Sequence, residues 1–252
     1  MISYEFPLNE RIRTMLRLED LFARFDHFAN RQDSHDHHAA LMVMFEIMEV
    51  ASRADLKSDL IQELERQKHT LEALRNNPQI AEDALDQVLN DIEHASARLL
   101  EMVGRIGQHL RDNEWLMSIK QRTSIPGGAC EFDLPSYYYW QRKPLEARQT
   151  DLREWIGPLT PLQDGFSIVL HLLRDSGKAM HYIARKGVFQ QMSGGKIVQL
   201  LKVSLDENYA CVPELSANKY AINVRFTHPV TGQDKPRQFD GDVEFNLTYC
   251  NL

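Results

Sequence analysis

The hydrophobic pattern of this chain changes its period near residue 176, and that change constrains the fold more than any other feature. Before it, apolar residues recur every three or four positions, which is the spacing of amphipathic helices. After it, they alternate with polar residues, as in half-buried strands. The sequence therefore predicts an α+β fold, with an N-terminal α-helical domain that contains a long antiparallel helical hairpin, plus a small antiparallel β-sheet domain.

Residues 121–135, which read QRTSIPGGACEFDLP, interrupt the helical pattern. Pro126, Gly127 and Gly128 specify a turn, because proline fixes its own φ and glycine allows a positive φ. Residues 130–134 then alternate apolar with polar, so we expect a strand that ties the helical domain to the later sheet. The predicted domains are therefore 1–125 with 140–176 for the helices, and 126–139 with 177–252 for the sheet.

The hairpin is predicted from two helices, over 54–75 and 78–106, on either side of a break at 76–78. Steps of three and four in the second helix make a heptad seam of Leu85, Val88, Ile92, Ala95, Leu99, Met102 and Ile106. A thin hairpin buries little apolar surface, so it should pack on the helical body or on a second copy. We favour a homodimer, with a self-contained hairpin as the alternative.

Helices are also expected to begin near Asn9 and Asp33, and to cover 145–156 and 159–174, with His171 as a hydrogen-bonded core residue. Strands are predicted over 179–191, 197–205, 219–226 and 243–249. In the third strand, alternation puts Lys219, Asn223 and Arg225 on a polar face, and Tyr220, Ile222, Val224 and Phe226 on an apolar face.

Bulk properties favour a folded protein in a reducing compartment. The 252 residues are 43% hydrophobic, and the three cysteines form no CxxC pair, so we expect free thiols. No signal peptide is visible, and the longest apolar run, around 39–45, is far shorter than the roughly 18 residues of a membrane span. We expect a soluble cytoplasmic protein that makes no membrane contact.

Charge is distributed unevenly. Residues 177–252 contain nine Lys and Arg against seven Asp and Glu, which is a charge of +2. The whole chain carries a net charge of −7, so the first 176 residues carry −9. No carboxylate occurs between Asp175 and Asp206. An acidic partner for the C-terminal part would explain this pattern, although ordinary scatter would also produce it.

Motifs for catalysis are sparse. His35, His37 and His38 form the metal candidate, but a solvated helix terminus is the favoured interpretation. The Ser-Gly-Gly-Lys stretch at 193–196 is better explained as a hairpin turn than as a phosphate loop. We expect no metal, no cofactor and no enzyme activity; a metal-dependent enzyme that uses the three histidines is the least favoured hypothesis.

Nucleic-acid binding is the alternative function. A regulator could use the polar face of the sheet together with the aromatic run at 137–140, whose rings are able to stack on bases. However, the chain is acidic, and packing where helices meet the sheet explains the aromatic run better. We therefore expect no nucleic-acid partner.

Several segments, in the same order over the whole chain, resemble the ZapD family of Z-ring-associated bacterial cell division proteins. They are PLNERIR at 7–13, LRLE at 16–19, RIGQ at 105–108, QRTSIPGG at 121–128 followed by Cys130, FDLP at 132–135, and Trp140. The resemblance implies a cytoplasmic homodimer at midcell, with a helical and a sheet domain. It implies that the protein binds the C-terminal tail of the tubulin-like protein FtsZ, bundles FtsZ filaments and stabilises the Z-ring.

The same resemblance suggests which residues bind the tail. Lys219 and Arg225 fall at basic positions of the family's corresponding strand, and Arg17 lies in the shared LR-x-E stretch. Arg225 should matter more than Lys219, because a guanidinium pairs bidentately with a carboxylate. Charge alone adds Lys178, Arg185, Lys186 and Lys202.

Overall fold

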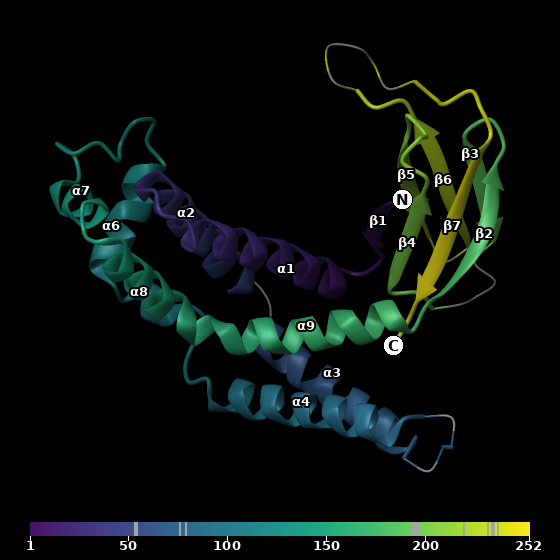
Figure 1. Ribbon diagram of the computed structural model, residues 1–252, viewed down its shortest axis with the longest axis horizontal. Helices are drawn as coiled ribbons and strands as arrows, with labels where there is room; N and C mark the ends of the chain where they lie inside the picture. The colour runs from purple at the N-terminus through teal and green to yellow at the C-terminus, as the bar shows by residue number, and fades with distance from the viewer. Residues whose placement is uncertain are drawn as a thin grey trace. The chain divides into compact units, whose positions relative to one another are not determined.

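The computed structural model describes residues 1–52, 55–75, 77–78, 80–192, 197–218, 220–230, 232, 235 and 237–252 (Figure 1). The chain forms two compact units, one made of Met1–Arg13 with Leu170–Leu252 and the other of Thr14–Val169. The first, which we call the sheet unit, holds the strands, and the second, the helical unit, holds most of the helical residues. The fold is α+β, as predicted.

Two of the helices begin at the capping side chains that the sequence predicted. Asn9 Oδ1 accepts a hydrogen bond from the Ile12 N–H at 2.8 Å, and Asp33 Oδ1 accepts one from the His35 N–H at 2.7 Å, so both predicted helix starts are confirmed. The helices are α1 (Glu10–Ala29), α2 (Ser34–Ala51), α3 (Leu56–Glu72), α4 (Glu82–Glu101), α5 (Gln108–Arg111), α6 (Glu114–Thr123), α7 (Pro135–Gln141), α8 (Leu145–Ile156), the 3₁₀ turn η1 (Gly157–Leu159) and α9 (Thr160–Asp175).

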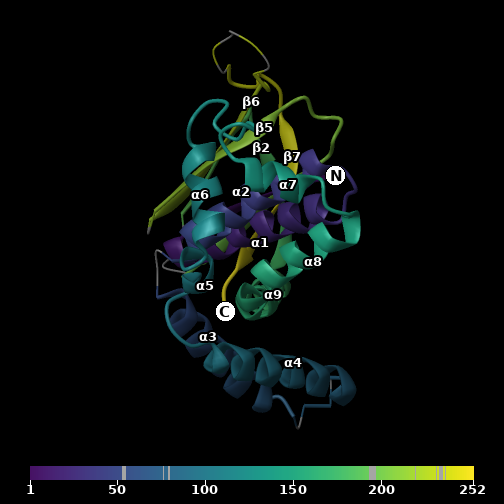
Figure 2. The same cartoon turned by 90° about the vertical axis from the view of Figure 1, so that its left-hand side faces the viewer.

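Helices α3 and α4 form the predicted antiparallel hairpin and lie side by side (Figure 2). Ion pairs join them, with Lys68 Nζ 2.9 Å from Glu93 and Arg75 Nη1 2.8 Å from Asp86. The seam differs from the prediction in two ways. Leu89 is buried in place of Val88, and α4 ends at Glu101 because the backbone is extended at Met102, so Met102 and Ile106 lie outside the helix.

The seam of the hairpin packs on α9 within the helical unit. A Cβ added at Gly165 would lie 3.0 Å from Leu99 Cδ1 and 3.5 Å from Leu60 Cδ1, so the missing side chain lets the helices approach closely. Beside this contact, Arg98 pairs with Asp164. The hairpin therefore covers its apolar stripe with the helical body, which is one of the two arrangements that we predicted.

The segment 121–141 contains the predicted turn but not the predicted strand. Gly127 has a φ of +72°, in the region that favours glycine. The N–H groups of Asp133 and Leu134 both donate to the Cys130 carbonyl, at 3.0 and 2.9 Å. These bonds coil the chain into turns, and Pro135 then starts α7, so the strand predicted over 130–134 is wrong. Cys130 is exposed, and residues 126–139, predicted as part of the sheet domain, lie within the helical unit.

Tyr137 and Trp140 are buried, as the packing interpretation predicted, but their partners belong to the helical unit and not to the sheet. Trp140 lies 6.0 Å from Trp115 and 5.7 Å from Trp155, measured between ring centroids. The Tyr137 hydroxyl is 2.6 Å from His38 Nδ1. Tyr137 and Trp140 therefore belong to the core of the helical unit at α6, α7 and α8, whereas Tyr138 and Tyr139 are exposed.

The strands form two antiparallel sheets, a four-stranded sheet in the order β1-β4-β7-β2 and a three-stranded sheet in the order β3-β6-β5. Sequence patterning missed β1 and β5. It also merged β2 and β3, which a turn at Lys186 and Gly187 separates. The strands are β1 (Ile2–Pro7), β2 (Lys178–Ala184), β3 (Val188–Met192), β4 (Leu200–Leu205), β5 (Val212–Ala217), β6 (Ala221–Thr227) and β7 (Val243–Cys250).

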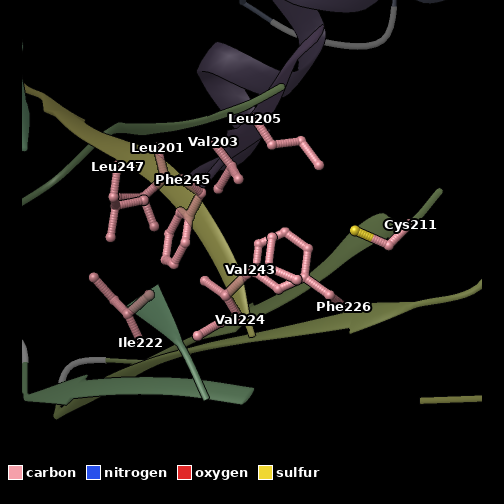
Figure 3. Close-up of a cluster of buried hydrophobic side chains, with 11 residues drawn as sticks. Leu201, Val203, Leu205, Cys211, Ile222, Val224, Phe226, Val243, Phe245 and Leu247 are labelled. Carbon is pink, nitrogen blue, oxygen red and sulfur yellow. The ribbon is translucent and has the colours of Figure 1, made fainter. Parts of the chain in front are cut away.

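Apolar side chains from both sheets meet in one core (Figure 3). The Phe245 ring lies 5.2 Å from the Phe226 ring in an edge-on arrangement, and 5.2 Å from the Phe189 ring. Alternation along β6 explains why Ile222, Val224 and Phe226 point into this core while Arg225 does not. A second sheet thus covers the apolar face that the sequence predicted.

Replacing Gly187 by alanine should destabilise the sheet unit. Gly187 has a φ of +72°, and an added Cβ would lie 2.4 Å from the Phe239 carbonyl oxygen. We expect Gly187→Ala to lower the free energy of unfolding by more than about 1 kcal/mol, measured by urea denaturation. Gly232→Ala is the control, because nothing lies within 4 Å of its added Cβ, and it should stay within about 0.5 kcal/mol of the parent. Equal stability of the two variants would contradict this account of the turn.

Candidate partner-binding site

Arg225 lies on the outer face of the three-stranded sheet, opposite the core. Its register partners are Val188 in β3 and Glu214 in β5, and Val188 also pairs with Arg185 across the turn between β2 and β3. Residues directly opposite one another share a face, so these four side chains form a row across the sheet. All four are exposed. We call this set, Arg185, Val188, Arg225 and Glu214, the outer row.

The turn that ends the outer row is held by Asp242. Its carboxylate accepts a hydrogen bond from the Lys186 backbone N–H at 2.9 Å and pairs with the Arg185 guanidinium. The Lys186 hydrogen bond and, next, the Arg185 side chain lower the pKa of Asp242. Lys186 itself has a φ of 49°, so its backbone shapes the turn and its ammonium extends from the tip of a fixed loop.

Lys178 and Lys202 belong to the other sheet. Lys202 lies in the centre of β4 between Glu5 and Thr248, and it is half-buried. The Glu5 carboxylate accepts two hydrogen bonds of 2.8 Å from the Arg174 guanidinium. Lys178 is exposed at the start of β2, opposite Tyr249.

Two further predicted residues remain. Arg17 is exposed on α1 and belongs to the helical unit. Lys219 lies outside the described residues. Of the seven candidates, the structure therefore brings together Arg185, Lys186 and Arg225, and it separates Lys178 and Lys202 from them.

Sequence reasoning missed a basic cavity in the helical unit. It has a volume of about 490 Å³ and is lined by Lys57, Arg105 and Arg111 together with Asp55. Lys57 Nζ donates to the Met102 carbonyl at 2.7 Å, and Arg111 Nη1 donates to the Ile106 carbonyl at 3.0 Å. Three cations around one cavity suit an acidic group. The signal was present in the RIGQ segment at 105–108, which we used only to identify the family resemblance.

His35, at the start of α2, is exposed as the helix-terminus interpretation predicted, but His37 and His38 are not solvated. His37 is fully buried, and its Nε2 lies 2.8 Å from the Arg31 carbonyl oxygen. His38 is half-buried against Tyr137. Among the described residues, no group of three or more His, Cys, Asp or Glu side chains is placed to hold a metal ion. His171, expected in the core, is instead exposed and 3.2 Å from Asp175, because the buried positions of α9 fall on its other side.

In the part of the chain that the structure describes, every helix is too short or too polar to pass through a bilayer.

Comparison with known proteins points to one family. The family model described as "ZapD: Cell division protein" matches residues 16–225. The chain is 62% identical over 252 residues to a protein of Chromobacterium violaceum named "Cell division protein ZapD", and the match covers all of both chains. Proteins with the same name from Dechloromonas aromatica and Azoarcus sp. are 55% and 54% identical, again over the full length of both chains.

Buried histidines should make the helical unit sensitive to acid. Burial lowers the pKa of both His37 and His38 from 6.5, because it disfavours the charged imidazolium. The unfolded chain then binds protons that the folded chain does not, so this stability is present above about pH 6.5 and is lost as the pH falls. We expect the free energy of unfolding to decrease between pH 7 and pH 5, measured by urea denaturation.

Replacing His38 by glutamine should make that decrease smaller, since the variant has one buried imidazole fewer. The control is His94→Gln, at an exposed position of α4, which should leave the pH dependence unchanged. The same pH dependence in His38→Gln as in the parent would contradict the prediction.

Proposed function

The chain belongs to the ZapD family of cell division proteins, and on that premise we propose that it binds the C-terminal tail of FtsZ, bundles FtsZ filaments and stabilises the Z-ring at midcell. The relatives' shared name supports a role in cell division. The observation that carries the finer proposal is the outer row, where Arg185 and Arg225 are exposed on one sheet face with Lys186 at the adjoining turn. Such a face suits a peptide that carries carboxylates.

Bundling requires two tail sites in one particle, and a homodimer would provide them. Two weak contacts held together bind filaments far more tightly than either alone, because the second contact forms at a high effective concentration. The hairpin seam packs on α9 of its own unit, so the dimer would use other surfaces. We propose a non-catalytic cytoplasmic adaptor whose activity is crosslinking.

The tail requirement is tested by sedimentation of FtsZ filaments. Full-length FtsZ should pellet as bundles together with this protein, and added salt should weaken the effect because exposed charges are screened within about 8–10 Å at physiological ionic strength. FtsZ without its tail should form filaments but no bundles. Undiminished bundling of the tailless filaments would refute the proposal.

Charge reversals of opposite sign in the outer row should affect tail affinity differently. Arg225→Glu should weaken binding of a labelled tail peptide about three- to tenfold, since it removes a pairing guanidinium and adds repulsion. Glu214→Lys, the neighbour in the same row, should leave the affinity equal or increase it. Fluorescence anisotropy measures both, and the melting temperature shows that each variant is folded. Equal weakening by both substitutions would mean that the row acts through stability and not through charge.

A further inference from the structure

The basic cavity of the helical unit lies where three segments of the chain meet. They are the end of α2, the start of α3 and the segment that joins α4 to α5. Gly104 and Gly107 have positive φ values, of +79° and +72°, so the joining segment turns sharply between its two helices. The polar side chains that decide what the cavity binds are those of Asp55, Lys57, Ser58, Arg105 and Arg111, all in its lining.

Hydrogen bonds to the backbone fix two of the three cations. Lys57 Nζ donates to the Met102 carbonyl, and Arg111 Nη1 donates to the Ile106 carbonyl. A Cβ added at Gly107 would lie 3.2 Å from Arg111 Nη1, so the missing side chain leaves room for the guanidinium. Because carbonyl groups are neutral, these bonds hold the two side chains in place and leave their positive charge uncompensated. An anionic ligand would therefore lose little free energy in ordering them.

The charge of the lining indicates the charge of the ligand. Lys57, Arg105 and Arg111 supply three positive charges, and Asp55 supplies one negative charge, so the described lining carries a net +2. A phosphate monoester carries about −1.5 to −2 at neutral pH, which balances that sum. A single carboxylate would neutralise only half of it. The charge balance therefore favours phosphate over carboxylate as the group that the cavity binds.

The start of α3 adds hydrogen-bond donors to the cations. The helix begins at Leu56, and the side chain of its N-cap residue Asp55 makes no capping hydrogen bond. The backbone N–H groups of a first helical turn have no acceptor within the helix, and they give that end a partial positive charge. Lys57 and Ser58 belong to this turn and line the cavity, so the positive end of α3 lies at the cavity. Phosphate oxygens accept hydrogen bonds from the backbone at such helix ends.

The size of the cavity indicates more than a lone phosphate. Its volume of about 490 Å³ is within the range of pockets that bind small organic molecules. A phosphate fills only part of that space, and the remainder accommodates an organic body such as a nucleoside. Arg105 is exposed, and its planar guanidinium is able to pair with a second phosphate or to stack on a base.

We propose that the basic cavity binds a small molecule that carries a phosphate or diphosphate group, such as a nucleotide. Lys57 and Arg111 hold the phosphate at the start of α3, and Arg105 pairs with it from the exposed side. The bound group links α3 to the segment between α4 and α5, so it stabilises the helical unit. The cavity belongs to the helical unit and the outer row to the sheet unit, so the inference does not rest on tail binding.

Isothermal titration calorimetry with the full chain tests the binding. The probes are inorganic phosphate, inorganic pyrophosphate, and the mono- and diphosphates of adenosine and guanosine, with the two nucleosides as blanks. At least one phosphate-bearing probe should bind at one site per chain, added salt should weaken it, and the nucleosides should not bind. Nucleotides that bind more tightly than pyrophosphate would identify a nucleotide site, whereas equal affinities would identify a site for the phosphate groups alone.

Two substitutions with opposite effects locate the site. Arg105→Ala should weaken binding about three- to tenfold, because it removes a cation that pairs with phosphate oxygens. Asp55→Asn should tighten binding about two- to fivefold, because it removes a negative charge from the lining, and damage to the fold would not have that effect. Arg31→Ala is the matched control, since Arg31 is exposed in the same unit but does not line the cavity, and it should bind as the parent does. Melting temperatures without ligand show that each variant is folded.

Three outcomes would overturn the inference. No binding of any phosphate-bearing probe at millimolar concentration would refute it, even if an acidic peptide bound the cavity instead. Affinities that Arg105→Ala and Asp55→Asn leave unchanged would place the bound probe elsewhere on the chain. Succinate that binds as tightly as the phosphate-bearing probes would show a surface that attracts anions in general. None of these results bears on whether the protein bundles FtsZ filaments.

Discussion

Pairing between the first and the later strands of the chain is the constraint on which the sheet unit depends. Strand β1 pairs with β4 from Ile2↔Leu205 to Pro7↔Leu200, and β4 pairs in turn with β7. The Ser3 and Ser204 hydroxyls join residues 201 positions apart. The helical unit is therefore an insertion between two neighbouring strands of one sheet. The α3–α4 hairpin within it joins helices that follow one another along the chain, whereas the sheet must close a very long loop before its core forms.

The pattern of apolar residues correctly predicted elements that bury one face and pack against segments nearby in the sequence. The helix starts at Asn9 and Asp33, the α3–α4 hairpin, and strands β6 and β7 followed from periodicity and capping. It failed where a distant contact decides the structure: β1 is six residues long, ends in proline and pairs with a strand about 200 residues away. In 130–134 the alternation was real, but hydrogen bonds to the Cys130 carbonyl closed the chain into turns.

The candidate sites show the same limit. Alternation alone placed Arg225 on an exposed face, because Val224 and Phe226 on either side are apolar. Nothing in the sequence showed that a turn would bring Arg185 into the same row, or that Lys202 would lie beside Glu5 on the other sheet. The contacts among the three tryptophans were likewise out of reach, since Trp115, Trp140 and Trp155 come from three helices and meet only after α6, α7 and α8 have packed.

The position of β1 also has a consequence for synthesis on the ribosome. At roughly 5–20 residues per second, the approximately 200 residues between β1 and β4 take on the order of 10 to 40 seconds to translate. During that interval β1 is an unpaired strand with Tyr4 and Phe6 uncovered, while the helical segment that follows it can already collapse. Strand β1 is thus translated before the helical unit but pairs after it, and until then it is open to chaperones that recognise extended apolar segments.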